Sequence, residues 1–199
     1  MEISVKIKNA LKKRRLWGVV AVVCLIPSLG HAALTQWQVD SNQSTLNFTG
    51  VQNGAPLTGS FKTFEGQIAF DPQALEKSKV LFTLDTNSLS FSYAPLVEMA
   101  KAPDWLHVKH FPQAKFVSEK ITQVSSEHYQ MQGALSIRDK SAPVTVDFTF
   151  VPQSSHQAQA KGNFVIQRTM FGVGQGEWAS TEEIKNDIKV TFDFKLTER

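Results

Sequence analysis

The sequence predicts an all-β fold, a single antiparallel sheet that curls into a barrel of about eight strands and carries one short helix. The clearest sign lies in the last segment, where the apolar residues Ile188, Val190, Phe192 and Phe194 alternate with polar ones. The same two-residue period returns near residues 131–137, 144–150 and 164–166, always with one apolar side. A sheet this wide must curl or leave exposed edges, and a closed barrel of about eight strands can either pack its interior or hold one small ligand.

Turn residues between the apolar segments place the individual strands. Asn53-Gly54 and Asp71-Pro72 separate the early segments, and Gly172-Val173-Gly174 indicates a tightly turned end rather than a phosphate-binding loop. We therefore expect strands at residues 35–40, 44–52, 57–70 with a bend, 79–86, 114–124, 128–138, 143–151, 158–169 and 186–197.

One segment, residues 92–102, breaks the strand pattern. Its apolar residues Tyr93, Leu96, Val97 and Ala100 follow helical spacing, Pro95 suits a first turn, and a second proline follows at position 103. A short helix between strands of a barrel either closes an open end as a lid or plug, or is a plain crossover that covers core. Both readings stay open at this point.

The N-terminal residues have the organisation of a secretory signal peptide. Six basic residues between positions 6 and 15 precede an apolar run over residues 16–29, and Gly30-His31-Ala32 provides a small-residue cleavage site. The apolar run is too short to cross a bilayer comfortably. We expect cleavage near Ala32, a periplasmic location, and one domain over residues 33–199.

Without residues 1–32 the chain keeps 15 basic and 17 acidic residues, a net charge of −2. The basic character of the whole chain therefore belongs to the leader, and no concentration of Lys and Arg remains for nucleic acid or acidic lipid. The single cysteine, Cys24, also lies in the leader, so the mature chain depends on burial and not on disulfides.

The aromatic composition bears on what fills the barrel. All 14 phenylalanines lie in the mature chain, beside two tyrosines and three tryptophans. A wall of Phe, Val, Ile and Leu offers contact area and almost no hydrogen bonds. The composition suits either a cavity for an apolar ligand or an ordinary filled core.

Residues for catalysis are few. His107 and His110 are three positions apart, but no third ligand for a metal lies near them in the sequence. No serine lies in a nucleophile-elbow motif. A small secreted hydrolase that uses His107 or His110 with a nearby serine or acid remains an alternative to a binding protein.

Several motifs occur in a fixed order along the chain. They are Trp37, Asp40, Ser44 and Phe48 as W-x-x-D-x-x-x-S-x-x-x-F; Gly59 to Asp71 as G-x-F-x-x-F-x-G-x-I-x-F-D; Phe111-Pro112; Gly133-x-Leu135-x-Ile137-Arg138; and Arg168 with Phe171-Gly172-x-Gly174. Together they resemble the YceI-like family of bacterial periplasmic proteins, over essentially all of residues 35–197.

The resemblance implies a lipocalin-like barrel whose long apolar cavity holds a polyisoprenoid chain, such as a quinone tail or a prenyl phosphate. It implies neither catalysis, nor a metal, nor a further cofactor. Residues 52–59 look more like the branch associated with membrane b-type cytochromes, which makes such a cytochrome a candidate partner. A poorly closed seam would also favour a homodimer through edge strands.

The leading interpretation is a periplasmic carrier of an isoprenoid lipid, and the alternative within this fold is a filled structural barrel that binds a membrane cytochrome. The residues expected to form the cavity wall and its lid are Phe48, Phe61, Phe64, Phe82, Leu84, Leu96, Met99, Trp105, Phe116, Leu135, Phe148, Phe164 and Phe192.

Overall fold

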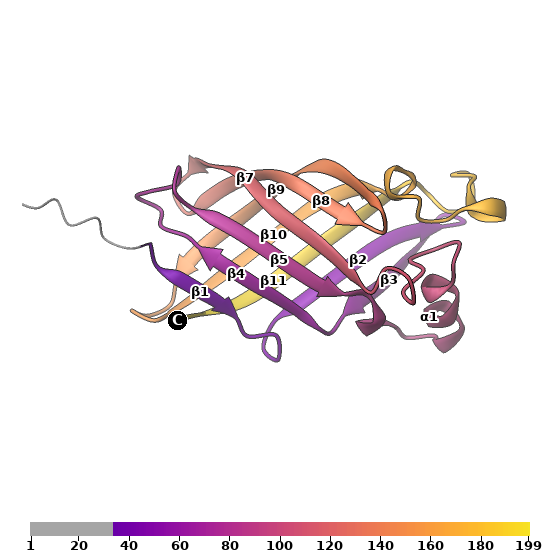
Figure 1. Ribbon diagram of the computed structural model, residues 1–199, viewed down its shortest axis with the longest axis horizontal. Helices are drawn as coiled ribbons and strands as arrows, with labels where there is room; N and C mark the ends of the chain where they lie inside the picture. Colours follow the sequence, from indigo (N-terminus) through magenta and orange to yellow (C-terminus); the bar gives the residue numbers. More distant parts are fainter. Residues whose placement is uncertain (1–33) are drawn as a thin grey trace, which may run out of the picture. The chain divides into compact units, whose positions relative to one another are not determined.

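The structure, a computed structural model, describes residues 34–199. The described part holds one α-helix, three short 3-10 helices and eleven strands (Figure 1). The strands are β1 (Gln36–Val39), β2 (Thr45–Gln52), β3 (Ala55–Phe61), β4 (Phe64–Ala69), β5 (Lys79–Asp85), β6 (Leu89–Phe91), β7 (Gln113–Ser125), β8 (His128–Ile137), β9 (Lys140–Pro152), β10 (Gln157–Gln167) and β11 (Asp187–Glu198). The helix is α1 (Ala94–Lys101).

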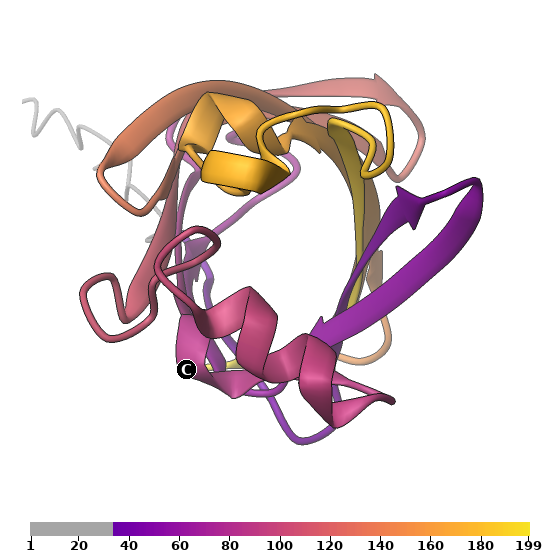
Figure 2. The ribbon, with the colours of Figure 1, turned by 90° about the vertical axis from the view of Figure 1, so that its right-hand side faces the viewer.

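Eight of these strands form a closed antiparallel ring, which confirms the expected barrel. The ring runs β1-β4-β5-β7-β8-β9-β10-β11 and closes because β1 pairs with β11. Strands β2, β3 and β6 branch from β11 at the α1 end, where the β2–β3 hairpin splays outward (Figure 2). One edge of β11 therefore serves two partners, β1 near its C-terminal end and β2 near its N-terminal end.

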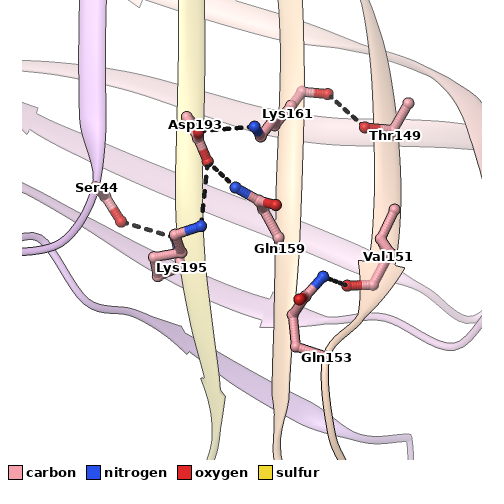
Figure 3. Close-up of polar contacts among 8 residues, drawn as sticks. All are labelled: Ser44, Thr149, Val151, Gln153, Gln159, Lys161, Asp193 and Lys195. Atoms are coloured by element: carbon pink, nitrogen blue, oxygen red, sulfur yellow. Dashed lines mark hydrogen bonds and ion pairs between the residues drawn. The ribbon is translucent and has the colours of Figure 1, made fainter.

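A short turn divides β1 from β2, and its side chains explain the first sequence motif. The Asp40 N–H donates to the Lys195 carbonyl, and the Lys195 N–H donates to Ser44 Oγ, both at 2.9 Å (Figure 3 shows the second contact). The Asp40 carboxylate accepts the N–H of Asn42 at 3.0 Å, which stabilises the turn. The backbone of β11 thus stays hydrogen-bonded across the gap between its two partners.

The segment at residues 57–70, expected as one bent strand, is two strands. The break falls at Lys62 and Thr63, because β3 pairs with β2 whereas β4 pairs with β1. Strand β6 was not predicted, because its three residues are too few to show a period. The strand expected to reach residue 169 ends at Gln167, where Arg168–Phe171 form a 3-10 turn.

The end of the barrel near the C-terminus is closed by four buried aromatic residues, which we call the aromatic plug: Trp37, Phe70, Tyr129 and Phe150. Ring centroids lie 4.7 Å apart for Phe70 and Phe150 and 5.5 Å apart for Trp37 and Phe150. The indole N–H of Trp37 donates to the Phe70 carbonyl at 3.2 Å, so the polar atom of that ring is satisfied.

Helix α1 lies at the opposite end of the barrel, and the loop that follows β10 lies across the same opening from it (Figure 2). Pro95 occupies its first turn, and Ala102 ends it with an extended backbone, which confirms the helix expected at residues 92–102. Tyr93 was expected on the apolar face but is 61% exposed, because it is the capping residue that precedes the first turn.

The described residues include no helix that is both long and apolar enough to cross a membrane. The predicted signal peptide, residues 1–32, lies outside the described residues.

Candidate functional site

The α1 end of the barrel contains a cavity of about 190 Å³, which we call the outer chamber. Met99 and Ala100 of α1 form part of its wall, together with Trp105 and Leu106 just after the helix. Strands β2, β3, β10 and β11 supply further Phe, Leu, Ile and Val side chains. Almost all of the surface that faces the chamber is carbon, so its contents gain contact area but few hydrogen bonds.

A second cavity of about 100 Å³, the inner chamber, lies deeper and next to the aromatic plug. Phe70 and Phe150 of the plug belong to its wall, as do Phe82 and Phe192. No polar atom is exposed to it. Protein interiors are normally packed without voids larger than a water molecule, so two apolar chambers in one small barrel are an unusual amount of space.

The two chambers follow one another along the barrel. The inward residues of β11 show the order: Ile188 and Val190 line the outer chamber, and Phe192, Phe194 and Leu196 line the inner one. The apolar side that the alternation predicted therefore borders cavities and also packs as hydrophobic core.

The structure brings eleven of the thirteen expected wall and lid residues to the chambers. The outer chamber is lined by Phe48, Phe61, Leu84, Met99, Trp105, Leu135 and Phe164. The inner chamber is lined by Phe82, Phe116, Phe148, Phe192 and again Phe164. Contact of these residues with a ligand stays a prediction.

Phe64 and Leu96 line neither chamber. Phe64 is only 3% exposed, and its ring lies 5.6 Å from that of Phe82 and 5.4 Å from that of Phe194. It is ordinary core behind the wall. Leu96 lies in the first turns of α1, away from the chamber, whereas Met99 and Ala100 one turn later border it.

Arg168, which the sequence analysis noted only as part of a motif, organises the loop that borders the outer chamber. It is 1% exposed, and all five of its N–H groups donate to backbone carbonyls. The acceptors are Lys185, Val173, Gly174, Ser180 and Ile184, at 2.7 to 3.3 Å. A Cβ at position 174 would collide with Arg168 Nη1, and φ there is +80°, so this position requires glycine.

The charge of Arg168 has no carboxylate partner among residues 34–199. Burial lowers the pKa of the guanidinium, because desolvation disfavours its charged form. The guanidinium also lies over the Trp105 ring, 5.7 Å from the centroid, which partly offsets that cost. Because every donor is in use, Arg168 holds the loop after β10 in place and has no free N–H for a ligand.

A second arginine, Arg138, links two loops at the α1 end of the barrel. Arg138 Nη1 donates to the carbonyls of Pro103, Trp105 and Gly172, so one side chain connects the segment after α1 with the loop after β10. Arg138 Nε and Trp105 Nε1 are nevertheless buried without an acceptor. An unsatisfied buried donor costs about 1–3 kcal/mol, so this end of the barrel is less well satisfied than the plug.

His107 and His110 do not form a catalytic arrangement. Their rings stack 5.4 Å apart beside Phe111, and within the described chain neither imidazole is hydrogen-bonded to a serine or a carboxylate. No group of three or more metal-ligating side chains occurs in that part of the chain. The geometry therefore offers the hydrolase alternative no support.

Comparison with known proteins places the chain in a family. The profile of the YceI-like domain matches residues 37–196. A UPF0312 protein of Enterobacter sp. strain 638 is 30% identical over 144 residues, which cover 71% of this chain and 74% of that protein.

Two solved structures have the same fold. The Burkholderia cenocepacia protein BcnA superposes with a TM-score of 0.75 at 30% identity, covering 79% of this chain and 98% of that one. A domain from Saccharophagus degradans, described as polyisoprenoid-binding and implicated in plant cell wall breakdown, gives a TM-score of 0.64 at 10% identity over 82% of this chain and 98% of that one. The chain belongs to the YceI-like domain family.

Proposed function

We propose that this protein binds and carries a long-chain isoprenoid lipid in the periplasm, with the hydrocarbon tail inside the barrel. The observation that carries the proposal is the pair of successive chambers with almost no polar surface. The Saccharophagus degradans domain, described as polyisoprenoid-binding, has the same fold and supports this choice of ligand class.

The free energy of burying hydrocarbon favours a ligand whose tail lies inside the barrel. Each isoprene unit buries four to five carbons, which gives a favourable free energy of transfer from water of about 3 kcal/mol at ~0.8 kcal/mol per methylene. Free transfer of a long tail through water is therefore very slow, and a soluble carrier removes that barrier. The walls offer no comparable gain to a polar head group, since almost no polar surface faces the chambers and the donors of Arg168 are all in use. The head group then lies outside the chambers, at the α1 end.

Native mass spectrometry of protein purified without detergent tests the proposal. Wild type is expected to carry cellular isoprenoid. Ala114→Phe, which places a ring into the outer chamber, is expected to lose it. Val117→Phe lies on the same strand but is 49% exposed, so it is the matched control and keeps the lipid. Absence of lipid from wild type, with no uptake of added polyprenol, would support the filled structural barrel instead.

The location is part of the proposal. Export with cleavage near Ala32 predicts that the protein from an osmotic-shock fraction begins near Ala33. Recovery only from membranes, with Met1 intact, would contradict a periplasmic carrier.

The partners expected from the sequence also remain proposals. A membrane b-type cytochrome would suit a carrier of quinones. Within residues 34–199 the branch strand β6 pairs only with β3, which leaves one edge for a second copy. Co-purification with a tagged cytochrome and sedimentation analysis, respectively, test these two partners.

A further inference from the structure

We propose that Phe164 is an internal gate between the two chambers and sets the length of tail that the barrel accepts. This inference rests on the proposed function. The walls of the two chambers share only two lining residues, Leu46 and Phe164. A tail that fills the outer chamber can reach the inner one only by passing these two side chains.

The two residues of this partition differ in how firmly they are held. Leu46 is 7% exposed and lies on β2 directly opposite Phe192 of β11 and Phe61 of β3, so it is packed on both sides. Phe164 is only half-buried. Because its neighbours Asn163 and Val165 are exposed on the outside of the barrel, Phe164 faces inward, and its open surface faces the chambers.

Most of the other phenylalanines in the inner wall are held by neighbouring rings. Phe192 stacks on Phe194 at 4.7 Å, and a Cβ at Gly162 would lie 2.5 Å from the Phe192 ring, which shows how closely that ring covers the glycine. Phe82 stacks on Phe194 at 5.2 Å. Within residues 34–199 Phe164 belongs to no aromatic pair of this kind.

The backbone at this position is paired on one side only. Pairing between β9 and β10 ends at Asn163, so within residues 34–199 β10 is paired only with β11 from Phe164 onward. Phe164 packs against the core on one side but borders both chambers, so a change of its χ1 rotamer displaces fewer neighbours than rotation of a ring held in an aromatic stack. Rotation of this ring would join the two chambers into one tunnel.

Competition between farnesol and solanesol tests the gate, because these prenols share a hydroxyl head group and differ in the number of isoprene units. Their relative occupancy is measured by native mass spectrometry on wild type, Phe164→Ala and Phe164→Trp. We expect Phe164→Ala to raise the solanesol-to-farnesol affinity ratio about tenfold, since a long tail no longer displaces the ring. Phe164→Trp is expected to lower that ratio while farnesol still binds the outer chamber.

Ile166→Ala is the matched control, because Ile166 lies on the same strand and the same face but lines the outer chamber alone. It should weaken both prenols together and leave their ratio unchanged. If both prenols bind wild type but neither substitution at Phe164 alters the ratio, the gate is wrong and the proposed function stands. If wild type binds neither prenol, the proposed function fails and the gate fails with it.

Discussion

The two ends of the barrel are built from the same kinds of residue but are packed very differently. At the aromatic plug, four rings fill the space between the strands, and the Trp37 N–H has an acceptor. At the α1 end, Trp105 borders an open chamber, and its N–H has none. The tightest packing and the larger cavity therefore lie toward opposite ends of one sheet, and the cavity costs packing energy that the rest of the fold must supply.

The sharpest test of this contrast is a matched pair of phenylalanine truncations. Phe70→Ala in the plug, where the ring is 2% exposed, is expected to lower the free energy of unfolding by about 4 kcal/mol. Phe61→Ala, beside the outer chamber, is expected to cost about 2 kcal/mol or less in lipid-free protein, because its ring is already partly unpacked. Urea unfolding measures both, and equal losses would show that the α1 end is as well packed as the plug.

The next prediction concerns the loop that Arg168 organises. Arg168→Met keeps the length of the side chain but leaves five carbonyls without a donor, and we expect a loss of about 3 kcal/mol. Hydrogen exchange should accelerate over residues 172–185 and stay unchanged in the plug. Lys185→Met is the control, because Lys185 contributes only backbone hydrogen bonds and its side chain is exposed. Uniform acceleration across the barrel would contradict a role confined to this end.

Helix α1 offers a smaller effect that separates a lid from a crossover. Met99 borders the outer chamber and Leu96 does not, so Met99→Asp is expected to speed lipid release about tenfold, while Leu96→Asp changes it little. We also expect the amides of α1 to exchange faster in lipid-free than in loaded protein. Transfer of a fluorescent prenol to vesicles measures release. The same rate for both variants and wild type would make α1 a plain crossover with the entrance elsewhere.

The smallest effect is expected on the outer surface between the two ends, at Asp193 (Figure 3). Partial burial raises the pKa of its carboxyl, but hydrogen bonds from Gln159 at 2.6 Å and Lys161 at 3.1 Å, with the charges of Lys161 and Lys195, outweigh burial and lower the pKa overall. The carboxylate therefore stabilises the fold above its unfolded pKa of about 3.9 and stops doing so as the pH falls through the lower folded value.

Asp193→Asn should accordingly reduce stability at neutral pH by about 0.5 kcal/mol or less, because the pair is exposed and screened. The difference from wild type should vanish in acid below that folded pKa, which urea unfolding at several pH values can follow. A difference that persists there would show that Asp193 acts through packing rather than charge.

Much of the strand layout is readable from the sequence, because a strand with one wet and one dry face shows its period directly. The apolar residues at alternate positions of 188–196 line the interior as expected, and Pro95 places the first turn of α1. The breaks were harder to predict. Residues 57–70 look continuous, and only the pairing of β3 and β4 with different partners divides them at Lys62 and Thr63.

The alternation and the order of the motifs determine by themselves that the chain forms a barrel with one phenylalanine-rich face. Only the tertiary structure decides that this face encloses two successive chambers, which extend from α1 to the aromatic plug. The reason is geometric. The contact of Phe70 with Phe150, and the position of Phe164 at the border of both chambers, depend on how distant strands approach one another when the barrel closes. The same is true of Arg168, whose five carbonyl partners come together only when the loop after β10 folds around it.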